Sequence, residues 1–160
     1  MQSVPAWARA LAAAWFGVLA TIALVAAPAA FATLARADAG RYVARVFGLE
    51  AWTSLTIALL LLFVEQRRAR AVADAGRGSV MSGATLMLLG TVFCTVLTRF
   101  GIEPMMSAAR SGEGAWSFGA LHAASTALYG LKALLVLVLA WRWQRQAASD
   151  EEPPTRGPAS

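Results

Sequence analysis

The sequence predicts an all-α fold, an integral membrane bundle of four transmembrane helices, and three observations carry this prediction. Hydrophobic residues make up 58% of the 160 residues and charged residues only 14%, against about 25% charged residues in an average soluble domain. Too few polar side chains are present to cover a surface in water, which excludes a soluble globular domain and a disordered protein. The single cysteine, Cys94, excludes a scaffold held by intramolecular disulfides. The third observation is that the apolar residues gather in four long stretches.

These four stretches are long enough to cross a bilayer, which takes about 20 residues of α-helix. We predict spans at residues 9–34, 43–65, 79–99 and 115–142. The second span reaches full length only if it includes Arg45 and Glu50. Residues 147–160 combine prolines with adjacent acids and are predicted to form a disordered cytoplasmic tail. We find no internal repeat in the sequence.

The first span has an alternative interpretation as a secretory signal. A short basic start, an apolar core and small-residue sites at residues 30–32 or 37–39 are typical of such signals. Residues 10–35, however, carry no formal charge and exceed the usual apolar core of about 7–15 residues. We therefore predict a span that is not cleaved.

The loops predict the orientation. Eight arginines fall at the N-terminus, in the loop after the second span and in the tail, and five fall on the opposite side. Because cytoplasmic loops retain Lys and Arg, this difference favours both termini in the cytoplasm. We expect a multi-pass protein of a bacterial inner membrane.

The basic charge does not indicate nucleic acid. A net charge of +5 and a pI of about 10.7 would raise that possibility in a soluble domain, but no arginine run is interleaved with aromatic residues here. The expected partner is the lipid bilayer. Small residues at four-residue spacing, such as Gly90, Cys94 and Thr98, would allow close helix packing and a homo-oligomer.

The fourth span carries a stripe of polar residues. At 100° per residue they occupy roughly a third of the helix circumference. They are His122, Ser125, Thr126, Tyr129 and Lys132. Ionisable groups inside a membrane are expensive and are candidates for function by default, so this stripe should face the bundle interior or a wet crevice.

Counting depth from the span ends predicts a polar cluster on the outer side. Its expected members are Arg41, Arg45, Glu50, Arg99, Glu103 and His122. These groups either neutralise one another and fasten the helices or form a site for a proton, ion or small ligand. His122 would be its switch, because histidine titrates near neutral pH. For Lys132, which needs a partner or a crevice, we expect no acid at its own depth.

Two stretches resemble a known family. In residues 26–47 and 100–125 the motifs are Pro-x-x-Phe and I-x-P-x-M followed by F-x-x-L-H-x-x-S. They are similar to the bacterial domain-of-unknown-function 4149 family, which resembles eukaryotic transmembrane protein 205. The resemblance implies four transmembrane helices and names no biochemical activity. The positions that carry it and lie at or near the expected outer side are Pro28, Phe31, Gly40, Phe47, Pro104, Arg110 and His122.

Three functions remain open at this point. The first is a protein that binds or moves a small solute, ion or proton through the outer polar site. The second is a metal- or haem-related membrane protein similar to copper-resistance D proteins, with Met105, Met106 and His122 as soft ligands. One histidine is too few for bis-histidine haem ligation. The third is a structural or assembly partner in the envelope.

We do not expect an enzyme. The sequence lacks a HExxH zinc motif and a Gly-Lys-Ser phosphate loop. Cys94 has no activating histidine at its depth. We therefore assign no catalytic residue, no metal and no cofactor.

Overall fold

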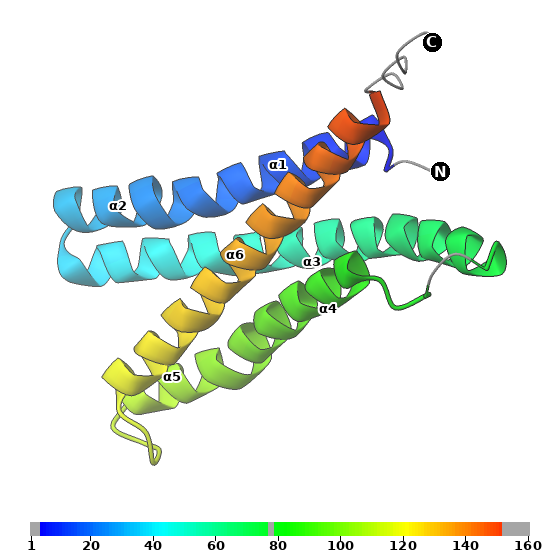
Figure 1. Ribbon diagram of the computed structural model, residues 1–160. Coiled ribbons are helices and arrows are strands. Elements are labelled where there is room, and N and C mark those ends of the chain that lie inside the picture. The colour runs from blue at the N-terminus through cyan, green and yellow to red at the C-terminus, as the bar shows by residue number, and fades with distance from the viewer. Residues whose placement is uncertain (1–3, 77–78, 152–160) are drawn as a thin grey trace, which may run out of the picture.

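The computed structural model describes residues 4–76 and 79–151, which form four long helices and no strand (Figure 1). The first comprises α1 (Ala6–Thr21), a π-helix (Ile22–Ala26) and α2 (Ala27–Thr33). The second is α3 (Arg36–Asp74). The third comprises α4 (Gly83–Val96), a π-helix (Leu97–Ile102) and α5 (Glu103–Arg110), and the fourth is α6 (Phe118–Glu151).

All four helices are long and apolar enough to cross a membrane, so the predicted fold class of a four-helix membrane bundle is confirmed. Their outward surfaces carry exposed apolar side chains, among them Leu24 and Phe93 at 76% and 63% exposure. Such surfaces suit lipid, because acyl chains solvate apolar side chains as well as another helix does.

The helices extend beyond the predicted spans. The second begins at Arg36 rather than at residue 43, and the third runs to Arg110 rather than to residue 99. Prediction from hydropathy ends a span where charges begin, whereas a helix can continue into the headgroup region with its charges in water. α6 likewise continues to Glu151, through residues 147–151 of the predicted tail; residues 152–160 lie outside the described residues.

Both π-helices immediately precede a proline near the start of the next helix. Pro28 follows Ile22–Ala26, and Pro104 follows Leu97–Ile102. A proline in a regular α-helix lacks an N–H and its ring clashes with the carbonyl four residues earlier. That carbonyl belongs to a π-helical residue in both places, where the wider turn relieves the clash. The two prolines therefore account for the two π-helices.

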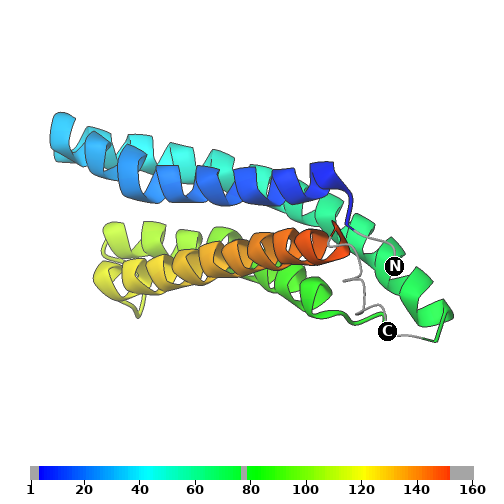
Figure 2. The ribbon, with the colours of Figure 1, turned by 45° about the horizontal axis from the view of Figure 1, so that its top comes forward.

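The four helices pack as two antiparallel hairpins that lie in two layers (Figure 2). α1 packs against α6 and α4 packs against α3, so the first helix of each hairpin contacts the second helix of the other. α4 also packs against α6, and α2 packs against α3. The central apolar core includes Trp15, Leu19, Leu61, Leu88 and Trp143.

The buried positions of the first hairpin recur in the second. A constant spacing of 76 residues relates buried positions of α1 to buried positions of α4: Ala8 to Ala84, Ala12 to Leu88, Trp15 to Thr91 and Leu19 to Thr95. The two prolines share this spacing. A spacing of 82 residues relates buried positions of α3 and α6: Ala39 to Leu121, Glu50 to Lys132, Ser54 to Val136, Ala58 to Ala140 and Leu61 to Trp143. Most equivalent residues differ in type, which is why inspection of the sequence found no repeat.

This recurrence makes the bundle a pair of halves, with α1 to α3 in one and α4 to α6 in the other. α1 and α4 start at the same end of the molecule (Figure 1). The halves are therefore parallel repeats of one pattern of buried positions, although α4 packs against α6 more extensively than α1 packs against α3.

The two ends of the bundle differ. Figures 1 and 2 show the α2–α3 connection standing apart from the α5–α6 connection. We call this end, residues 27–45 and 99–122, the splayed end. At the opposite end the start of α1 and the last turns of α6 lie side by side. We call it, residues 4–12, 65–76, 79–84 and 139–151, the terminal end.

Candidate functional site

A buried ion pair joins the two halves. The Lys132 ammonium donates to both carboxylate oxygens of Glu50, at 2.8 and 2.9 Å. The two side chains are only 4% and 3% exposed. Glu50 follows the first residue of α3, Arg36, by 14 positions, and Lys132 follows the first residue of α6, Phe118, by 14. Each is about 21 Å from its helix start at 1.5 Å per residue, which brings them to the same depth.

Neutral polar groups complete a network around this pair. The Ser54 hydroxyl donates to Glu50 Oε1. In turn, Trp15 Nε1–H donates to Ser54 Oγ at 2.9 Å. Since Trp15 lies on α1, Glu50 on α3 and Lys132 on α6, the network connects three helices in the bundle interior.

Tyr129 covers the network on its other side. The Lys132 ammonium lies 4.7 Å from the centre of the Tyr129 ring, within the range of a cation–π interaction. The Tyr129 hydroxyl donates to the carbonyl oxygen of Leu19 at 3.0 Å, three residues before the π-helix of the first half. Phe47 packs edge-on against the same ring, with centroids 5.0 Å apart. The fourth helix is thereby tied to the first and the second at one depth.

The expectation that no acid shares the depth of Lys132 was wrong. When the second span is taken to begin at residue 43, Glu50 falls near its outer end. Because α3 begins at Arg36, Glu50 lies deeper, and it pairs with Lys132 rather than with His122.

The predicted outer cluster does not assemble as one group. Arg99 forms an ion pair with Glu103, as their four-residue spacing on a helix permits. Arg41 pairs instead with Asp38 of its own helix. Arg45 is exposed on α3, and Glu50 is buried away from these groups.

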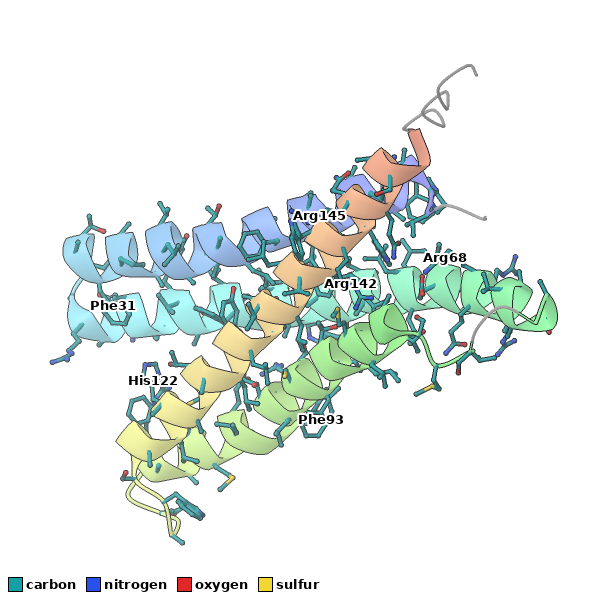
Figure 3. All side chains as sticks on the ribbon, in the orientation of Figure 1. Phe31, Arg68, Phe93, His122, Arg142 and Arg145 are labelled. Atoms are coloured by element: carbon teal, nitrogen blue, oxygen red, sulfur yellow. The ribbon has the colours of Figure 1, made fainter. Side chains whose placement is uncertain are left out.

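His122 is exposed at the splayed end (Figure 3). Its ring stacks on Phe118, with centroids 5.9 Å apart and planes 10° from parallel. The Arg110 guanidinium lies 4.9 Å from the centre of the same Phe118 ring. Two of the motif positions, Arg110 and His122, are therefore brought together through Phe118.

The remaining predicted positions take less central places. Ser125 is half-buried one turn after His122. Gly40 is half-buried, and Phe31 is exposed on α2.

A second buried carboxylate was missed by the sequence analysis. Glu65 is 1% exposed and accepts from Arg68 Nε and Nη2 at 2.9 and 3.0 Å. It also accepts from the Ser82 hydroxyl at 2.6 Å. Ser82 in turn caps the N-terminus of α4 by accepting from the Thr85 N–H at 3.1 Å. An E-x-x-R pair, and a serine before an apolar run, are the sequence features that indicate this arrangement.

A small cavity of about 210 Å³ adjoins this second cluster. It is lined by Arg68, Ala69, Val72, Ser79, Met81 and Ser82. Among the described side chains, those of residues 4–76 and 79–149, no three of His, Cys, Asp or Glu gather as metal ligands would. Met105 is 40% exposed and His122 is exposed and stacked on Phe118.

Comparison with known proteins places the chain in a family and assigns it no activity. A search of curated proteins found no match, and a search of solved structures found none. A family model described as "Domain of unknown function (DUF4149)" matches residues 10–115. This segment contains Glu50 and both prolines that follow π-helices, and it ends before α6, which carries Lys132. The match covers well over half of the chain, and the protein belongs to the DUF4149 family.

Proposed function

We propose that this protein is a non-enzymatic membrane protein that binds a small ion or solute together with a proton and moves it across a bacterial inner membrane. The Glu50–Lys132 pair is the proposed centre of this activity. The observation that carries the proposal is the burial of this pair between the two halves of the bundle.

A purely structural pair is the competing explanation, and its energetics make it the weaker one. Moving an ion out of water costs several kcal/mol even after relaxation, and a buried ion pair is often no more stabilising than apolar side chains of the same size. Helices that need only adhesion can use small and apolar residues. Ionisable residues inside a membrane are rare, and those that are kept mark ion and proton pathways.

The position of the pair also supports transport. Parallel repeats related by an axis across the membrane are a common plan for transporters, in which the two halves move against each other around a site between them. Here Glu50 belongs to one half and Lys132 to the other. A relative movement of the halves would therefore break or remake this contact.

The proposed topology keeps both termini in the cytoplasm and the splayed end outside. It follows the arginine count of the connections. A homo-oligomer is compatible with the proposal but not required by it.

The test uses purified protein in liposomes that contain a pH-sensitive dye. Gradients of sodium, chloride, sulfate and L-lactate are imposed one at a time, and the internal pH is followed. We expect at least one gradient to drive a pH change in wild type that Glu50→Gln abolishes. The matched control is Glu103→Gln, which removes a carboxylate at the splayed end and should keep the pH change. If no gradient moves protons above protein-free liposomes, the proposed function is wrong.

A further inference from the structure

The Glu50–Lys132 site also indicates what kind of ion it takes. We propose that its ligand is a small monocarboxylate anion, bound with one proton in an electroneutral step. This inference rests on the proposed function and adds the chemical class of the substrate.

The first step of the argument is charge balance. Of the described side chains, the fully buried charged ones are Glu50, Lys132 and Glu65, and Glu65 is neutralised by Arg68. Glu50 and Lys132 therefore balance each other in a region where an uncompensated charge is very costly. A charged ligand can enter only if the charge of the site changes by the opposite amount.

Two exchanges satisfy this condition. A monovalent anion can pair with the Lys132 ammonium if a proton from solvent bonds to a carboxylate oxygen of Glu50. Alternatively, a monovalent cation can pair with the Glu50 carboxylate if Lys132 loses a proton. Each leaves the net charge of the site at zero, and each links one ligand to one proton.

Hydrogen bonding distinguishes the two. Lys132 and Ser54 donate to the Glu50 carboxylate, and Trp15 donates to Ser54. A protonated Glu50 becomes a further donor. The site is thus rich in donors suited to an anion, whereas hard cations require several oxygen ligands. The side-chain oxygens around the pair belong to Glu50, Ser54 and Tyr129, and the hydroxyls of Ser54 and Tyr129 both donate, to Glu50 and to the Leu19 carbonyl.

The shape of the bound group follows from the same contacts. Lys132 and Ser54 already hold a carboxylate, that of Glu50, through both of its oxygens. When Glu50 is protonated, these donors are free to hold the carboxylate of a ligand in its place. The Glu50 carboxylate therefore occupies the position that a substrate carboxylate would take.

Charge at the splayed end favours anions as well. Of its five arginines, Arg41 and Arg99 form ion pairs with Asp38 and Glu103. The other three form no ion pair within the part of the chain that the structure describes: Arg36, Arg45 and Arg110. Against these five arginines the splayed end has three acids, Asp38, Glu103 and Glu113. Its net positive charge attracts anions and repels cations.

Two other titratable groups face the pair. Tyr129 of α6 lies beside both charges, and Cys94 of α4 is near Lys132. α1 contributes Trp15, which does not titrate. Glu50 is the acid that contacts Lys132, and it is therefore the proton acceptor of the step.

The test measures L-lactate uptake and internal pH in the same liposomes. An inward lactate gradient should acidify the interior of wild-type liposomes. The rate should stay within about twofold when valinomycin and potassium set a membrane potential, because an electroneutral step moves no net charge. A chloride gradient is the control for a monovalent anion without a carboxylate, and a sulfate gradient is the control for a divalent anion. Protein-free liposomes give the background.

Two variants assign the activity to the pair. Glu50→Gln cannot take up the proton, so it should lose the pH change while it keeps exchange of labelled lactate for lactate. Lys132→Met removes the anion partner, and its lactate exchange should fall about a hundredfold, the factor that matches roughly 3 kcal/mol for an unpaired buried charge. If a variant does not elute as folded protein in gel filtration, the proposal is judged on the wild-type measurements alone: the lactate, chloride and sulfate gradients and the effect of a membrane potential.

The outcomes separate the two proposals. If only the sodium gradient moves protons, the monocarboxylate inference is wrong and the proposed function stands. Lactate uptake that a membrane potential accelerates severalfold would overturn the electroneutral step. Chloride-driven flux equal to that of lactate would overturn the carboxylate assignment. If no gradient has an effect, both proposals fail.

Discussion

Glu50 and Glu65 are both buried carboxylates of α3, but their cations come from different parts of the chain. Arg68, the partner of Glu65, lies three residues later on the same helix and is 23% exposed. Lys132, the partner of Glu50, comes from the other half of the bundle and is 4% exposed. The comparison teaches that a pair within one helix at the terminal end fastens a local junction, whereas a pair between the halves couples them.

The largest expected effect is the loss of one member of the pair between the halves. Lys132→Met should lower the free energy of unfolding by about 3–5 kcal/mol, because Glu50 is left as a buried charge without a partner. Unfolding in detergent by titration with sodium dodecyl sulfate, followed by circular dichroism, measures this change. The double variant Glu50→Leu/Lys132→Met should recover most of the loss, since apolar pairs often replace buried ion pairs without cost. A double variant as unstable as the single one would contradict this account.

A smaller effect is expected at the local pair. Glu65→Gln should cost about 1–3 kcal/mol, the penalty for weakening buried hydrogen bonds, because Arg68 can turn its charge toward water. The same titration compares it directly with Lys132→Met. A loss equal to that of Lys132→Met would show that the two carboxylates do not differ as their partners indicate.

The serines next to the two carboxylates extend the comparison. Ser54→Ala removes the acceptor of Trp15 Nε1–H and a donor to Glu50. Ser82→Ala removes the cap of α4 and one donor to Glu65, which keeps both hydrogen bonds from Arg68. Ser54→Ala should cost about 1–3 kcal/mol, since it leaves a buried donor unsatisfied. Ser82→Ala should cost about 1 kcal/mol, as is usual for an N-cap. Thermal unfolding of the two variants side by side checks the order, which would be reversed if the network around Glu50 were dispensable.

The smallest effect is expected at His122. Because its ring is exposed, His122→Ala should change the free energy of unfolding by no more than about 0.5 kcal/mol. The pH dependence of lactate-driven proton movement should also keep its wild-type midpoint, since His122 makes no contact with the Glu50–Lys132 pair. A shifted midpoint would restore His122 as the switch that the sequence suggested.

Composition and hydropathy were sufficient to predict the four-helix membrane fold. They also indicated that Glu50 and Lys132 remain inside the spans, because both interrupt apolar stretches, whereas His122, which the same criterion placed with them, is exposed at the splayed end. Composition and hydropathy could not predict which of these charges pair with each other. Depth depends on where each helix starts, and the start of α3 lies in a stretch with three arginines and Asp38, which hydropathy excludes from a span.

The repeat between the halves was hidden for a different reason. Burial at equivalent positions requires only that a side chain fit the space, so Trp15 corresponds to Thr91 and Leu61 to Trp143. Residue identity is lost while the pattern of burial is kept. Only coordinates reveal which positions are buried together, and with them the equivalence of Glu50 and Lys132.

The equivalence of Glu50 and Lys132 has a consequence for how such a bundle can be encoded. Two identical hairpins related by a twofold axis would bring two glutamates or two lysines together, and like charges in a membrane interior repel strongly. Opposite charges at equivalent positions require two hairpins of different sequence, as the two halves of this chain are. A duplicated and joined chain can thus build a neutral, asymmetric centre that a dimer of identical subunits cannot.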